Sequence, residues 1–70
     1  MIIVTGASGF IGRAVALYLI EKKINPIILV DFFMSSDNKL KDCFFVHVDK
    51  LFDFIDNNKN KINYIIHLGA

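Results

Sequence analysis

Three of the four glycines in this 70-residue chain recur at three-residue intervals, as Gly6, Gly9 and Gly12. They follow the apolar residues 2–4 and open a stretch with helical periodicity, so the spacing predicts a tight turn between a strand and a helix. The first glycine permits a backbone conformation that a Cβ would forbid, the second admits a ligand to the backbone amides, and the third lets the helix pack near the strand. The helix then directs free N–H groups at the loop, which predicts an anion site.

An acidic residue closes the next apolar run, residues 27–30, about twenty residues after the last glycine. In a strand–helix–strand unit, this residue, Asp31, lies beside the glycine loop and can accept hydrogen bonds from both hydroxyls of an adenosine ribose. The loop and the carboxylate together predict a dinucleotide site. The alternatives are a purely structural glycine turn and an Asp31 that only caps a loop.

The periodicity of the remaining residues predicts alternating helices and strands. A helix is expected over residues 10–23, ended by Asn25-Pro26 because proline cannot continue a helix. The residues expected on its buried stripe are Ile11, Ala14, Val15, Tyr18 and Leu19. Residues 32–42 are turn-rich, with room for a brief helical turn. A short second helix is expected from residue 51 to the polar turn at 57–61.

Strands are expected at residues 2–5, 27–31, 44–48 and 63–68. Right-handed crossovers would place them in the order 3-2-1-4, which is an α/β fold of the Rossmann type with a doubly wound parallel sheet. A hydrophobic content of 54% suits strands that are buried on both faces. Seventy residues is about half of an ordinary domain, so residues 1–70 are expected to form the N-terminal portion of an incomplete nucleotide-binding domain without its substrate domain.

Charge and cysteine content limit the partners and the compartment. The net charge of +1 is spread along the chain, which favours neither nucleic acid nor a membrane as partner. No apolar stretch approaches the length of a membrane span, and no secretory signal is visible. Cys43 is the single cysteine and the chain has two histidines, so we expect a cytoplasmic location, a structural thiol and no metal site.

The segment Thr5-Gly6-x-x-Gly9-Phe10-Ile11-Gly12 resembles the signature of the extended short-chain dehydrogenase/reductases, the NAD-dependent epimerase/dehydratase family. The ending His67-x-Gly69-Ala70 resembles the family's fourth strand, whose small residues let the cofactor lie against the backbone. The resemblance covers the whole chain. It implies NAD or NADP as cofactor, a nucleotide-sugar substrate and a homo-oligomeric full-length enzyme.

The cofactor-binding residues predicted from the pattern and the resemblance together extend beyond the glycines and Asp31. Ser8 is a candidate phosphate contact, and Asp49 and Leu51 are placed near the adenine by the resemblance. Asp31 favours NAD over NADP because its charge repels a 2′-phosphate, whereas Lys39 or Lys41 can offset that repulsion. The remaining members of the predicted set are Phe10, Ile11, Phe32, Leu68, Gly69 and Ala70.

No catalytic residue is expected within the chain. The family's chemistry uses a tyrosinate, a lysine four residues later and a Ser or Thr, and the string Tyr18-x-x-x-Lys22 matches by coincidence, because it lies on the first helix. Within the family, the chain looks most like the ADP-glyceromanno-heptose 6-epimerases, from which residues 32–34 depart. Another sugar epimerase, dehydratase or reductase, a non-catalytic dinucleotide sensor, and a truncated product that does not fold are the alternatives.

Overall fold

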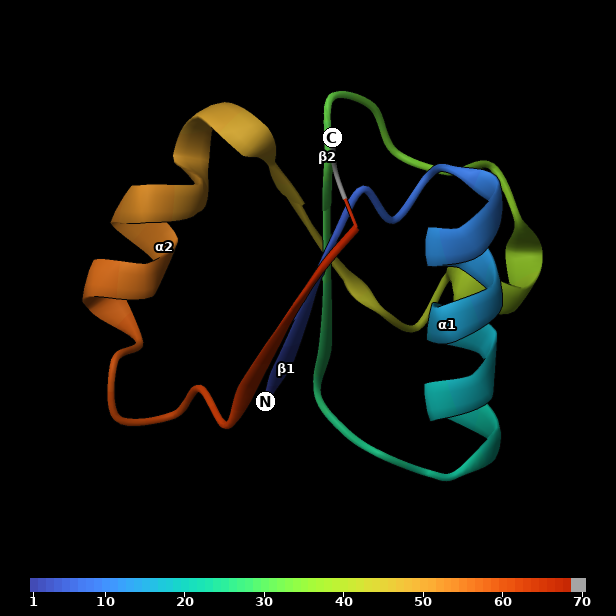
Figure 1. The fold of residues 1–70 in the computed structure, drawn as a ribbon, viewed down its shortest axis with the longest axis horizontal. Helices are drawn as coiled ribbons and strands as arrows, with labels where there is room; N and C mark the ends of the chain where they lie inside the picture. Colours follow the sequence, from blue (N-terminus) through green and yellow to red (C-terminus); the bar gives the residue numbers. More distant parts are fainter. Residues whose placement is uncertain (69–70) are drawn as a thin grey trace.

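A computed structural model describes residues 1–68 as a parallel sheet with one helix packed on each face (Figure 1). The strands are β1 (Ile2–Thr5), β2 (Ile27–Asp31), β3 (Phe44–His47) and β4 (Tyr64–His67). Helix α1 (Phe10–Glu21) connects β1 to β2, and α2 (Leu51–Asn57) connects β3 to β4. The strand order β3-β2-β1-β4 confirms the predicted α/β fold class and its 3-2-1-4 topology.

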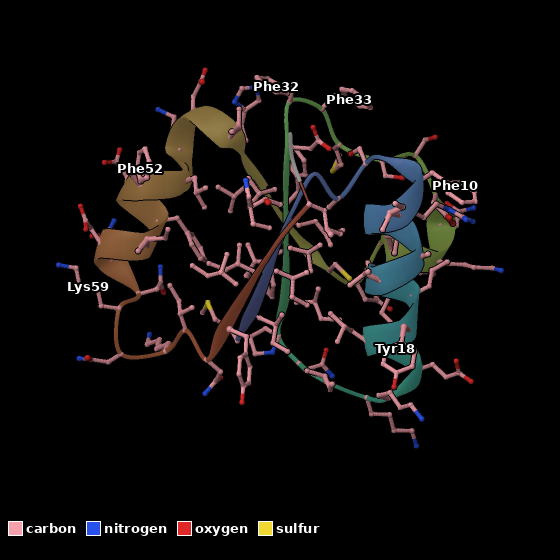
Figure 2. All side chains as sticks on the ribbon, in the orientation of Figure 1. Phe10, Tyr18, Phe32, Phe33, Phe52 and Lys59 are labelled. Atoms are coloured by element: carbon pink, nitrogen blue, oxygen red, sulfur yellow. The ribbon has the colours of Figure 1, made fainter. Side chains whose placement is uncertain are left out.

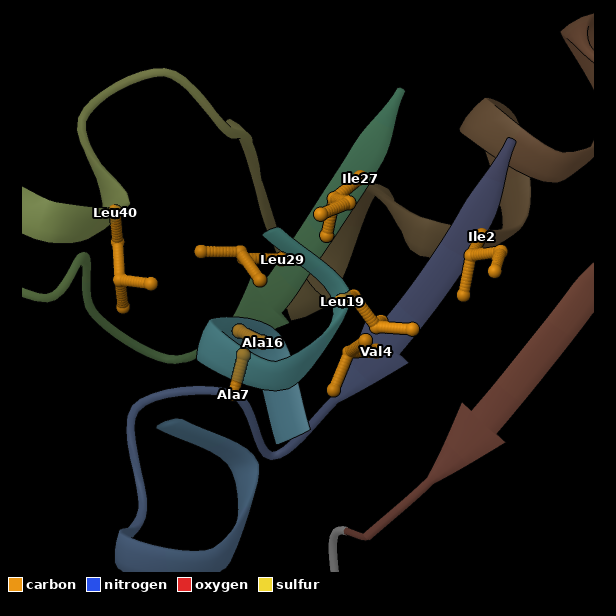
Figure 3. Packing of buried hydrophobic residues seen from close by; sticks show 8 residues of the cluster. All are labelled: Ile2, Val4, Ala7, Ala16, Leu19, Ile27, Leu29 and Leu40. Atoms are coloured by element: carbon orange, nitrogen blue, oxygen red, sulfur yellow. The ribbon is translucent and has the colours of Figure 1, made fainter. Parts of the chain in front are cut away.

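The two central strands are buried on both faces. Consecutive side chains of a strand point to opposite sides, so Ile3, Ile28 and Val30 pack toward α2, with Leu51 among the residues that cover them. The remaining apolar side chains of these two strands belong to the core under α1, which Figure 3 shows. That core contains Ile2, Val4, Ala7, Ala16, Leu19, Ile27, Leu29 and Leu40. Continuous apolar runs are required here because neither face of β1 or β2 meets water.

Helix α1 turns a different face to the sheet from the one predicted. Its buried residues are Gly12, Ala16 and Leu19, whereas Ile11 is 64% and Tyr18 58% exposed. The predicted stripe was confirmed at Leu19 and at the partly buried Val15, but it was wrong at Ile11, Ala14 and Tyr18, because the closest approach of helix and strand sets the rotation of the helix. A Cβ on Gly12 would lie 2.7 Å from the Cα of Ala7, so the small residues face inward.

The end of α1 is set by local hydrogen bonds and not by Pro26. The N–H of Lys23 donates to Ile20 O over 2.9 Å, and the N–H of Ile24 donates to Leu19 O over 3.1 Å. This pair of bonds is a Schellman motif, which places Lys23 in the left-handed region with φ 60°. The helix therefore stops at Glu21, before the predicted end at residue 23.

The outer strands are shorter than predicted. The ring Nδ1 of His47 accepts the N–H of Asp49 over 3.1 Å, which turns the chain into a 3₁₀ turn at Val48–Lys50 and ends β3 at His47. A second 3₁₀ turn, Asn38–Leu40, occupies the predicted turn-rich segment. β3 and β4 form the two edges of the sheet among the described residues and are only partly buried.

Candidate dinucleotide site

The glycine loop reverses the chain at the carboxyl end of β1. Gly6 has φ 67°, a conformation that side-chain-bearing residues rarely adopt. The N–H of Ala7 donates to Val30 O over 3.2 Å and the N–H of Gly9 donates to Gly6 O over 3.2 Å, so the loop is held across the end of β2. Gly9 is extended, with φ −77° and ψ 172°, and α1 begins directly after it.

The first turn of α1 presents unpaired backbone donors. Arg13 supplies the first N–H that bonds back along the helix, to Gly9 O over 2.9 Å, and Gly9 offers no side chain as a cap. Within residues 1–68, the N–H groups of Phe10, Ile11 and Gly12 have no acceptor. Three free donors at the positive end of a twelve-residue helix suit a phosphate group.

Asp31 lies in direct contact with this loop. Its Oδ2 accepts the backbone N–H of Ser8 over 2.9 Å, and its Oδ1 accepts the N–H of Phe32 over 2.7 Å. The bond from Phe32 is the kind of loop cap that was named as the alternative role of Asp31. The bond from Ser8, however, joins the carboxylate to the glycine loop. Each carboxylate oxygen has a further lone pair, so Asp31 can still accept hydrogen bonds from ribose hydroxyls.

A pocket of about 180 Å³ opens between the carboxyl ends of the strands. Of the predicted site residues, Gly6, Asp31, Phe32 and Leu51 line it. Its other lining residues are Thr5, Val30, Val48 and His67, which are not among the predicted cofactor-binding residues. These four residues could have been predicted from the sequence, because each stands at or next to the carboxyl end of an expected strand, where ligands of open α/β sheets bind.

A hydrogen-bonded pair holds the end of β4 against β1 beside this pocket. Thr5 Oγ1 lies 2.6 Å from His67 Nδ1 and accepts the backbone N–H of Leu68 over 3.2 Å. The predicted site residue Leu68 is therefore next to the pocket, although it does not line it. The predicted residues Gly69 and Ala70 lie outside the described residues.

The structure separates several predicted residues from the pocket. Phe10 is 89% exposed and its side chain points outward in Figure 2. If Phe10 contacts the cofactor, the contact is made by its backbone N–H and not by its side chain. The Asp49 carboxylate is exposed and does not line the pocket. Lys39 lines a second pocket with Lys23 and Asn25, near the amino end of β2. This position gives no support to a contact between Lys39 and a 2′-phosphate.

The segment after β2 is tied to the glycine loop and to α1. Ser8 Oγ donates to Phe33 O over 2.7 Å, and Arg13 Nε donates to Asp37 Oδ2. The N–H of Lys39 donates to the other oxygen of Asp37, and this bond together with the Arg13 guanidinium lowers the pKa of Asp37. Asp37 is therefore a carboxylate at neutral pH.

Other groups with chemical potential lie away from the pocket. Lys22 Nζ stands 5.4 Å from the centroid of the Tyr18 ring on the exposed side of α1, where a cation–π contact explains the pair. Burial, and then the charge of Asp42, raises the pKa of the Cys43 thiol, which makes it a poor nucleophile. Within residues 1–68, no group of three metal-ligating side chains comes together. None of the helices described there has the length and apolarity to cross a membrane.

Comparison with known proteins agrees with this geometry. The profile of the NAD dependent epimerase/dehydratase family matches residues 2–70. The chain belongs to that family. A solved structure titled monomeric L-threonine 3-dehydrogenase, from a metagenome and in its apo form, superposes with a TM-score of 0.75 at 37% identity. The match covers 100% of this chain and 23% of that one. No curated protein matches the chain.

Membership of the NAD dependent epimerase/dehydratase family confirms the recognition of the family and of its cofactor, NAD or NADP. The residues fit such a cofactor, since within residues 1–68 three N–H groups at the start of α1 have no acceptor and the pocket at the carboxyl ends of the strands is lined by Asp31. The chain spans 23% of the length of the dehydrogenase structure. The comparisons provide no support for the finer expectation of a heptose epimerase.

Proposed function

We propose that this chain is the N-terminal, dinucleotide-binding portion of an NAD(P)-dependent enzyme that epimerises a nucleotide sugar. The hydrogen bond from Ser8 N to Asp31 carries the proposal, because it joins the predicted pyrophosphate loop to the predicted ribose acceptor at the rim of one pocket. An ADP-glyceromanno-heptose is the first candidate substrate, on the resemblance of the opening segment. A cytoplasmic homo-oligomer is part of the same proposal.

Each part of the cofactor has a partner in this proposal. The free N–H groups of Phe10, Ile11 and Gly12 bind the pyrophosphate, and Asp31 accepts the ribose hydroxyls. Val48 and Leu51 supply an apolar wall for the adenine. Bound there, the cofactor would supply the reversible hydride transfer by which an epimerase oxidises a sugar carbon transiently and reduces it again from its other face. The catalytic residues are expected in the part of the enzyme beyond this segment.

L-threonine is the second candidate substrate. The dehydrogenase structure shares 37% identity over the whole of this chain, which favours a related alcohol oxidation. The two candidates differ in their redox balance. An epimerase returns the hydride and releases no reduced cofactor, whereas a threonine dehydrogenase produces one NADH for each threonine oxidised.

The test uses the complete protein that contains this chain. Calorimetric titration with NAD and with NADP measures binding, and the reduced cofactor is followed by absorbance with the ADP-heptose or L-threonine as substrate. Epimerised heptose without accumulated NADH supports the first candidate, and NADH formed from L-threonine supports the second. Cofactor binding without turnover of either substrate or of other sugar nucleotides favours a dinucleotide sensor. Failure to bind either dinucleotide overturns the proposal.

A further inference from the structure

We infer that Asp37 makes the site select NAD over NADP, by occupying Arg13 and adding a negative charge beside the ribose. The inference rests on the proposed function and deepens it, because it concerns which dinucleotide the site accepts. NAD and NADP differ only in the 2′-phosphate of the adenosine ribose. Discrimination must therefore come from groups near the 2′-oxygen, which the proposal places at Asp31.

Two contacts fold the segment after β2 onto the start of α1. Ser8 links this segment to the glycine loop, since its N–H donates to Asp31 and its hydroxyl donates to Phe33 O over 2.7 Å. Farther along, Asp37 reaches Arg13 on the first turn of α1. Neither Arg13 nor Asp37 lines the pocket itself, and in this inference a group extending from the 2′-oxygen beyond Asp31 meets the segment 32–37 and Arg13 outside it.

The charges in this region oppose a phosphate. Asp31 and Asp37 contribute two negative charges and Arg13 one positive charge, while Lys39, whose charge also acts on Asp37, lines the second pocket. Asp37 is only 17% exposed and both of its oxygens are used, by Arg13 and by the N–H of Lys39. Its contact holds the Arg13 guanidinium against the segment after β2. The terminal nitrogens of Arg13 bond to no other group within residues 1–68, so the cation is available once Asp37 is neutralised.

The test compares NAD and NADP affinities of the complete protein and of Asp37→Asn by calorimetry. Asparagine keeps an oxygen that can accept the N–H of Lys39, so the turn is retained. We expect the ratio of NADP affinity to NAD affinity to rise about tenfold, because one repulsive charge is lost and one cation is released. Asp42→Asn removes the same charge at the second pocket and should leave the ratio unchanged.

Arg13 provides the decisive second variant. Arg13→Gln alone should change either affinity little, because Asp37 already holds the cation, whereas the pair Asp37→Asn with Arg13→Gln should lose most of the gain seen with Asp37→Asn alone. An unchanged ratio in Asp37→Asn that still binds NAD overturns the inference, as does a gain that persists without Arg13. If Asp37→Asn does not fold, Asp37→Ser, whose hydroxyl can still accept the N–H of Lys39, takes its place, and an unchanged ratio in that variant overturns the inference. A wild-type protein that binds neither dinucleotide would instead refute the proposed function.

Discussion

The backbone N–H of Ser8 donates to Oδ2 of Asp31 over 2.9 Å, although the two residues are 23 positions apart. This bond places the carboxylate at the end of β2 beside the loop that begins α1. It forms because parallel strands joined by a right-handed crossover bring their carboxyl ends to the same edge of the sheet. The predictions below start from this contact and from the packing that supports it.

Replacing Asp31 by alanine should weaken NAD binding about tenfold to a hundredfold, the usual effect of losing hydrogen bonds to a charged group. NADP binding should fall less, because the same change removes a repulsive charge from the 2′-phosphate. Titration of the complete protein with both cofactors measures the two losses. Asp53→Ala, on the exposed side of α2, is the control for removing a carboxylate. Equal losses for the two cofactors would contradict a ribose role for Asp31.

Gly12→Ala should lower the free energy of unfolding by about 3 kcal/mol or more, since the new methyl group would meet the backbone of Gly6 and Ala7. Gly9→Ala is the matched comparison. A Cβ there lies 3.4 Å from Gly6 O and needs no unusual φ, so the cost should be about 0.5–1 kcal/mol, that of alanine at a helix N-cap. Urea unfolding of both variants tests the difference. Similar costs would mean that helix α1 can move away from the loop.

Lys23→Gly should stabilise the protein by about 0.5–1 kcal/mol, because Lys23 has φ 60° and glycine adopts that conformation without steric cost. The neighbouring Lys22 has φ −79°, so Lys22→Gly should give no gain. Thermal unfolding of the two variants beside the wild type measures the effect. A loss of stability in Lys23→Gly would show that the lysine side chain contributes more than the backbone strain.

Alkylation of Cys43 by iodoacetamide should be slow in the folded protein and fast in urea. The thiolate reacts, and burial raises the pKa of this thiol above its usual value of 9.0, so less thiolate is present at any lower pH. The same shift means that the folded state holds the proton more tightly. Its contribution to stability is therefore complete below the unfolded pKa and is lost as pH rises through the folded pKa. Equal alkylation rates in the two states would contradict the shift.

Much of the fold could be predicted from local patterns. Strand β2 was predicted with its observed bounds, because its continuous apolar run begins after Pro26 and ends at Asp31. The predicted ends of α1 and β3 were less accurate. Hydrogen bonds made by Lys23 and His47 end these two elements, whereas the predictions used the position of Pro26 and the composition of the chain. The predicted buried face of α1 was correct at Leu19 but wrong at Ile11 and Tyr18, because hydrophobicity favoured these two residues whereas close packing selected Gly12 and Ala16.

By itself, the sequence determined the strand order, the glycine turn and the position of Asp31 at a strand end, because these depend on local periodicity and on the handedness of crossovers. Only the tertiary structure decided which residues share the site. It joined Ser8 to Asp31 and Arg13 to Asp37, and it placed Lys39 at the second pocket. Such contacts depend on how closely a helix and a sheet approach each other, and residues far apart in the chain set that distance together.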